Sequence, residues 1–156
     1  MDKEAVLNAL TRVMELQLAD AVRHTHYALM VHAFNRLPIV AWLKKQAEEG
    51  LVHAHQAGEP VTWLGGRPSL SIGPLLQSHQ HGIGDIPRKS LDHEREALKA
   101  YCELLDLSKD KNVRLEEYAR DMIAEELAHQ DKADRTRTRL SGHTRETGRE
   151  ILELCK

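Results

Sequence analysis

The stretch AEELAH at residues 124–129 places Glu126 and His129 three positions apart. On a helix both side chains lean over the same face, and a carboxylate beside an imidazole is a natural half of a metal site. A near copy, AEEGLVH, occupies residues 47–53 and ends on His53. Two such pairs on two helices are what a metal ion inside a helical bundle requires. The repeated pair therefore favours a helical fold with a polar centre.

Hydrophobic periodicity predicts four long helices and one short one. The expected helices span about 4–35, 38–64, 86–107, 112–137 and 144–155. Residues 65–84 hold most of the Gly and Pro and show no helical period. A connection of that length can cross the length of a bundle. We therefore predict one all-α domain over residues 1–156, an antiparallel four-helix bundle with a long crossover between the second and third helices and a short C-terminal helix.

Polar residues interrupt the apolar face of each long helix near its middle. The first and third helices carry one carboxylate each, and the second and fourth carry a carboxylate with an imidazole. These six candidates are Asp20, Glu49, His53, Glu94, Glu126 and His129. Viewed alone, Asp20 and His24 could equally form a hydrogen-bonded pair in a core. Six candidates at matched depths favour one shared site.

Four carboxylates in a core need compensation for their charge. Bare charges would repel one another and lose their hydration, unless they were protonated or neutralised by cations. Two divalent metal ions would cancel the charge, and carboxylate oxygens with some imidazole suit iron or manganese. The sequence therefore predicts a site for about two metal ions per chain, with iron expected and manganese as the alternative.

Composition excludes several other classes of protein. The chain has 156 residues and a net charge of −2, with Lys and Arg spread among Asp and Glu, so nothing global favours nucleic acid or a membrane surface. Cys102 and Cys155 follow no metal-binding spacing, and we expect them to be buried thiols in a reducing compartment. Residues 1–4 do not begin a basic segment followed by an apolar run, and no stretch approaches the length of a membrane span, so we expect neither a leader nor a membrane helix. We predict a cytoplasmic protein.

Several short motifs follow one another in the order of a known family. They are YALMVHA from Tyr27, the pair His53-Ala54, LGGRP at residues 64–68, Glu94 with Tyr101, and Glu126-x-x-His129. Together they resemble the ferritin-like superfamily, and most closely the bacterioferritins, over nearly the whole chain. The resemblance implies a di-iron ferroxidase centre that oxidises Fe(II) with oxygen or hydrogen peroxide. It also implies a homo-oligomer, either a dimer or a hollow shell that stores ferric mineral.

The resemblance also assigns roles to the candidate residues. The ligand positions of the family fall on the six candidates, and Glu94 or Glu126 would bridge the metals as the catalytic carboxylates. The family usually has Glu where this chain has Asp20, and its Glu three positions before His53 is Gly50 here. Glu49 can reach the same face from one turn away, a π-bulge can absorb the extra residue, or this half-site has lost its carboxylate. Bacterioferritins present a Met haem ligand where this chain has Leu51, so we predict no haem.

Two other functions remain open from the sequence. Gly50 is compatible with a catalytically silent bundle that acts as a structural or interaction protein. The span 132–149 carries six basic residues against two acidic ones, which is compatible with a DNA-protecting protein of the Dps-like kind. A solvated helix face explains the same charges more simply, and we do not expect nucleic acid as a partner.

Overall fold

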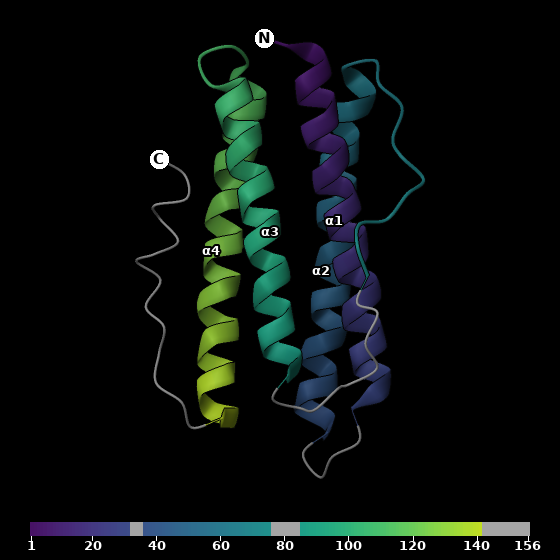
Figure 1. Cartoon of the computed structure of the whole chain (residues 1–156), viewed down its shortest axis with the longest axis vertical. Coiled ribbons are helices and arrows are strands. Elements are labelled where there is room, and N and C mark those ends of the chain that lie inside the picture. Colours follow the sequence, from purple (N-terminus) through teal and green to yellow (C-terminus); the bar gives the residue numbers. More distant parts are fainter. Residues whose placement is uncertain (32–35, 76–84, 142–156) are drawn as a thin grey trace. The chain divides into compact units, whose positions relative to one another are not determined.

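A computed structural model describes residues 1–31, 36–75 and 85–141, and their regular structure is entirely α-helical. The four helices are α1 (Lys3–Met30), α2 (Arg36–Trp63), α3 (Asp85–Ser108) and α4 (Val113–Ser141) (Figure 1). The four long helices predicted from the sequence are present, and the all-α class is confirmed. The short helix expected at 144–155 lies outside the described residues. Within the described ranges no helix is long and apolar enough to cross a membrane.

Polar side chains cap the start of two helices. The Asp2 carboxylate accepts hydrogen bonds from the main-chain N–H groups of Glu4 and Ala5, both at 3.1 Å. The side-chain oxygen of Asn112 accepts one from the N–H of Leu115 at 3.2 Å. Each cap satisfies N–H groups that have no partner within the helix, which explains why α1 and α4 begin where they do.

The C-terminal end of α2 is a Schellman motif. Gly66 N–H donates to Val61 C=O at 2.8 Å, and Gly65 N–H donates to Thr62 C=O at 2.9 Å. Gly65 has a φ of 77°, a conformation that glycine adopts without steric cost. Pro60 lies inside the last turn of α2, and the helix continues to Trp63, close to the predicted end at about 64.

Replacing Gly65 with Ala should lower the free energy of unfolding by about 1–2 kcal/mol, because a Cβ is disfavoured at this left-handed φ. Gly66→Ala is the matched control, since Gly65 is the glycine with positive φ among the described residues. Urea denaturation measures both changes. Equal effects of the two substitutions would contradict this account of the helix end.

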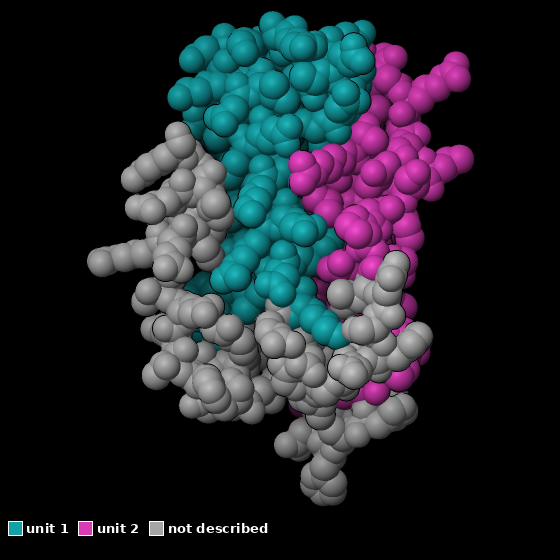
Figure 2. Space-filling model, viewed as in Figure 1, with its two compact units in different colours: residues 1–9, 87–156 teal, residues 10–86 magenta. Residues whose placement is uncertain are grey.

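The chain divides into two compact units. Unit 1 comprises Met1–Ala9 and Pro87–Lys156, and unit 2 comprises Leu10–Ile86 (Figure 2). Unit 1 therefore contains α3 and α4 with the first turns of α1, and unit 2 contains the rest of α1 with α2. The prediction of a single domain stays a prediction.

In unit 2, α1 and α2 pack antiparallel. Gly58 lies near Met14, Gly50 lies near Ala21, and the Trp42 ring contacts the His24 ring. Residues later in α2 thus contact residues earlier in α1. The segment after α2 returns along α1, since Gly73 N–H donates to Glu15 C=O at 2.7 Å. The described part of the predicted crossover, residues 65–75, thus returns along the first helix.

The buried face of α1 confirms the predicted periodicity. The residues at its steps of three and four are buried, except for the half-buried Asp20, and they are Leu10, Val13, Gln17, His24, Tyr27 and Val31. At the far end of this face Tyr27, Ala28 and Val31 form an apolar cluster with Leu43 of α2. The polar residues Gln17, Asp20 and His24 thus precede an apolar cluster on the same face of α1.

In unit 1, α3 and α4 are joined by a tight turn. The turn contains Asp110 at a φ of 57°, and the Asp110 N–H donates to the Glu116 carboxylate at 3.0 Å. The rings of Tyr101 in α3 and Tyr118 in α4 meet edge to face with centroids 6.1 Å apart. The short turn and the ring contact make these helices neighbours in a hairpin.

Cys102 corrects one expectation from the sequence. Its side chain is buried, as predicted, but it is disulfide-bonded rather than a free thiol. Cys155, the only other cysteine in the chain, lies outside the described residues. Spacing along a chain does not report distances in a fold, so it could not predict this bond. The cytoplasmic location stays a prediction.

Candidate metal centre

The six candidate ligands fall into two sets of three. Unit 2 holds Asp20 on α1 with Glu49 and His53 on α2, whereas unit 1 holds Glu94 on α3 with Glu126 and His129 on α4. Each unit thus supplies two carboxylates and one imidazole. Their union in one site stays a prediction.

The acids of unit 1 are deeply buried. Glu94 is 6% exposed and Glu126 is 3% exposed, while the neighbouring Glu96 and Glu125 are exposed. His129 is half-buried one turn after Glu126. A buried ionised carboxylate loses its hydration and needs a positive or hydrogen-bonding partner. Helical periodicity therefore selected the buried acids correctly, and these acids suit a cation.

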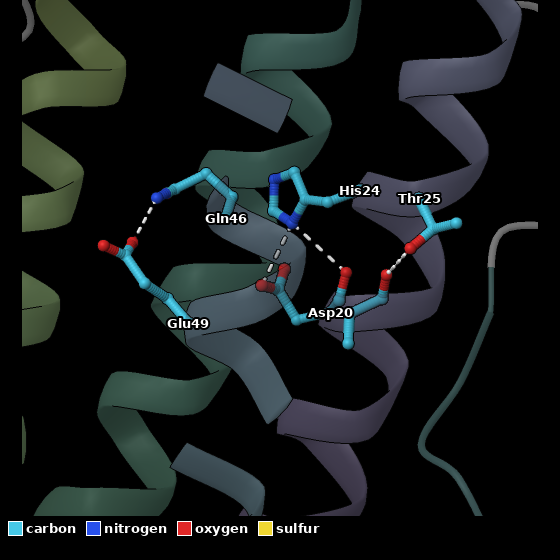
Figure 3. Close-up of polar contacts among 6 residues, drawn as sticks. Asp20, His24, Thr25, Gln46 and Glu49 are labelled. Carbon is cyan, nitrogen blue, oxygen red and sulfur yellow. Dashed lines mark hydrogen bonds and ion pairs between the residues drawn. The ribbon is translucent and has the colours of Figure 1, made fainter. Parts of the chain in front are cut away.

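Asp20 in unit 2 is engaged by the next turn of its own helix. The Nδ1 atom of His24 lies 3.0 Å from Oδ2 of Asp20 and 3.1 Å from its main-chain oxygen. Figure 3 shows the carboxylate turned toward the imidazole. The hydrogen-bonded pair that the sequence allowed for Asp20 and His24 is therefore present in the structure. The role of Asp20 as a metal ligand stays a prediction.

The Glu49 side chain is more exposed to solvent than that of Asp20. Its carboxylate accepts a hydrogen bond from the Gln46 amide, seen in Figure 3, and Lys45 Nζ lies 3.3 Å from its other oxygen. Glu48 is exposed, so Glu49 is the less exposed of the two adjacent acids. His53, one turn later, is buried. Binding of a metal ion by Glu49 would require its carboxylate to leave these two partners.

Gly50 is a packing residue where α2 lies against α1. A Cβ at this position would lie 3.1 Å from the Gln17 main-chain oxygen and 3.1 Å from the Ala21 nitrogen. Residue 50 therefore faces α1, which leaves no room there for a carboxylate. Of the alternatives left open for this position, the π-bulge is absent, because α2 is α-helical from Arg36 to Trp63.

Two buried tyrosines border the candidate carboxylates. Burial raises the pKa of Tyr27, the Arg23 guanidinium opposes that rise, and the Asp20 carboxylate adds to it. Burial also raises the pKa of Tyr118, and the negative charge of Glu126 raises it further. Both phenols are therefore neutral at physiological pH and can act as hydrogen-bond donors.

Sequence reasoning did not select His93 in α3. Its side chain is only 3% exposed, and it directly precedes Glu94. The burial pattern of α3 includes His93, Ala97, Ala100 and Leu104, which recur at steps of three and four. That second stripe was the signal available in the sequence. Each long helix thus carries an imidazole beside its candidate carboxylate.

The chemistry of these donors suits iron or manganese, but the side chains are not clustered. Among the residues that the structure describes, no group of three or more His, Cys, Asp or Glu side chains is placed to hold a metal ion. The donor types are hard oxygens with a minority of imidazole nitrogens, as iron and manganese prefer. The partners of Asp20 and Glu49 described above occupy both N-terminal carboxylates.

Comparison with known proteins identifies the fold. The family model of the ferritin-like domain matches residues 7–142. A ferritin-like diiron-carboxylate protein from Bacillus anthracis str. Ames is similar, with a TM-score of 0.81 and 20% identity over 87% of this chain and 97% of that one. The dodecameric thioferritin from Bacteroides fragilis has a TM-score of 0.81 and 18% identity over 91% and 89% of the two chains.

A bacterioferritin from Desulfovibrio desulfuricans is a third similar structure. Its TM-score is 0.79 and its identity 19%, over 97% of this chain and 87% of the other. No curated protein matches the sequence. At these identities the structural likeness establishes the fold, and the prediction of a four-helix bundle is confirmed.

Proposed function

Because this chain belongs to the ferritin-like domain family, we propose that it binds Fe(II) between its carboxylate and imidazole side chains and oxidises it with oxygen or hydrogen peroxide. The observation that carries the proposal is the burial of Glu94 and Glu126 at the middle of α3 and α4. Cations offset the cost of burying such carboxylates. Fe(II) is the substrate here, and manganese is the alternative metal.

The roles of the individual residues follow from their chemistry. Glu94 and Glu126 would each contact two ions, because a carboxylate has two oxygens and these two are the most buried acids. Asp20, Glu49, His53 and His129 would each hold one ion. Each Fe(II) loses one electron, so two ions together supply the two electrons that reduce oxygen to hydrogen peroxide with two protons. The expected stoichiometry is about two ions per chain.

The same proposal includes assembly. The similar structures include a dodecameric thioferritin, and we propose that this chain also forms a homo-oligomer, as a dimer or a shell that stores the ferric product. Its site of action is proposed to be the cytoplasm, with no membrane and no nucleic acid as a partner. In the described part of the basic region, Arg135 is hydrogen-bonded to Asp131, which reduces the charge available to phosphate.

The test combines composition, activity and size. Purified protein should take up about two Fe(II) ions per chain without oxygen, accelerate Fe(III) formation when oxygen or peroxide is added, and sediment as an oligomer. Elemental analysis, stopped-flow absorbance and analytical ultracentrifugation measure the three quantities. Protein that takes up no Fe(II) and leaves the rate of oxidation at that of buffer would overturn the proposal.

A silent bundle is the second candidate, and one observation favours it. Gly50 faces α1 and the adjacent Glu49 already pairs with Lys45 and Gln46, so the second helix offers a weakened carboxylate. A structural or interaction protein would keep its helices and its assembly without binding iron. The uptake experiment above separates the two functions, because only the first requires Fe(II) in the purified protein.

A further inference from the structure

His24 is a buried titratable residue that the proposed iron site does not use. Its side chain is 1% exposed, and its Nδ1 lies 3.0 Å from the carboxylate oxygen Oδ2 of Asp20. An ionised carboxylate can only accept hydrogen bonds, so Nδ1 must carry the hydrogen. The Nδ1–H group of His24 therefore faces two acceptors, Oδ2 and the main-chain oxygen of Asp20, and its bond to Oδ2 fixes the direction in which the carboxylate turns (Figure 3).

Packing from two helices holds the His24 ring. The Tyr27 ring, on the next turn of α1, meets it edge to face at 6.3 Å, and the Trp42 ring of α2 does so at 6.1 Å. Trp42 itself packs against the apolar cluster of Tyr27, Ala28, Val31 and Leu43. The imidazole is thus held in place between α1 and α2. The direction of its hydrogen bond to Asp20 is therefore fixed as well.

Asp20 differs from Glu49 in the kind of partner that it has. Glu49 pairs with Lys45, whose side chain is largely exposed, and such ion pairs restrain a side chain weakly. Asp20 is held by a buried donor on a rigid ring. The carboxylate of Asp is also shorter than that of Glu, so it has fewer torsions with which to correct a wrong direction.

We propose that His24 is a positioning residue that orients the Asp20 carboxylate for metal binding, an inference that rests on the proposed function of the site. Partners of a ligating carboxylate typically change metal affinity by about 10–100-fold when they are removed. His24 acts through Asp20 and contributes no ligand of its own. Without His24 the site would keep all its proposed ligands, but the Asp20 carboxylate would no longer be held in one orientation.

The test compares two substitutions of His24 with a control on the same helix. His24→Phe keeps a ring for the contacts with Tyr27 and Trp42 but removes the donor, whereas His24→Asn places an amide N–H where Nδ1 was. His26→Phe is the control, because His26 is half-buried and its ring also contacts the Tyr27 ring, at 6.1 Å. Co²⁺ serves as the probe, since it is stable in air and its absorption spectrum reports its ligands.

Titration of the full-length variants with Co²⁺ should give a clear order. His24→Phe should weaken binding by about 10–100-fold, His24→Asn should restore affinity to within about threefold of the parent, and His26→Phe should leave it unchanged. Circular dichroism and urea denaturation check that all variants are folded. A purely structural role for His24 predicts no rescue by Asn at equal stability.

Each other outcome has one meaning. Parent-like Co²⁺ affinity in His24→Phe would overturn the positioning role while leaving the proposed function intact. Loss of binding in both variants, with a Co²⁺ spectrum that shows one nitrogen ligand fewer, would make His24 a ligand and would also overturn it. If the parent protein binds neither Co²⁺ nor Fe(II), the proposed function itself fails.

Discussion

Replacing Glu126 and His129 together with Ala should abolish both Fe(II) uptake and Fe(II) oxidation while leaving the helices folded. Glu126 is the most buried of the candidate acids at 3% exposure, and His129 follows it one turn later on α4. Removal of hydrogen-bond partners of metal ligands already costs about 10–100-fold in affinity, so the loss of two ligands should exceed that range.

The double variant should lose less stability than a core truncation usually costs. A buried carboxylate opposes folding unless a partner compensates it, so its removal offsets part of the packing that is lost. Circular dichroism and urea denaturation measure the fold, and anaerobic Fe(II) binding with stopped-flow oxidation measures function. Retained helicity with lost iron chemistry is the expected combination.

Glu125→Ala is the matched control for this experiment. Glu125 carries the same charge on the same helix, one residue away, but its side chain is exposed. It should keep Fe(II) uptake and oxidation at the level of the parent. If the Glu126→Ala, His129→Ala double variant oxidised Fe(II) as fast as the parent, this assignment of the site would be wrong.

Replacing Gly50 with Ala should lower the free energy of unfolding by up to about 2 kcal/mol. A Cβ would stand 3.1 Å from main-chain atoms of Gln17 and Ala21, and helix backbone cannot move aside as a flexible side chain can. Forcing a methyl group into such a contact typically costs about 1–3 kcal/mol. Ala gains only about 1 kcal/mol over Gly from helix propensity, so the clash decides the sign.

Gly58→Ala is the control, because it makes the same substitution in the same helix. The nearest atom to a Cβ there is the sulfur of Met14 at 3.3 Å, which belongs to a flexible side chain. This variant should gain up to about 1 kcal/mol from helix propensity. Urea denaturation measures both variants, and a Gly50→Ala protein as stable as the parent would show that α1 and α2 do not depend on this contact.

The same geometry predicts that the family's Glu cannot be restored at position 50. Gly50→Glu should destabilise the protein more than Gly50→Ala. Its Cβ makes the same close contact with the α1 backbone, and the rest of the Glu side chain also has to fit between α1 and α2. Gly50 is therefore part of how these two helices approach each other. Glu49 is then the carboxylate that α2 can offer, and any metal function of unit 2 depends on it.

Periodicity alone predicted which acids would be buried. Glu94 and Glu126 were selected over Glu96 and Glu125 because burial on a helix repeats every three to four residues, which is a local property of the chain. Helix ends were predicted with uneven success. The end of α2 at Trp63 agrees with the expected 64, whereas α4 continues to Ser141 beyond the expected end at 137.

The four helices, their buried faces and the acids in the middle of those faces are therefore contained in the sequence, because hydrophobic periodicity and capping act between residues close in the chain. Only the tertiary structure decided the surroundings of Gly50 and His24. Gly50 lies against the backbone of α1, and the His24 ring lies against Trp42 of α2. Each is a contact between residues far apart in the sequence, and no local pattern encodes such a distance.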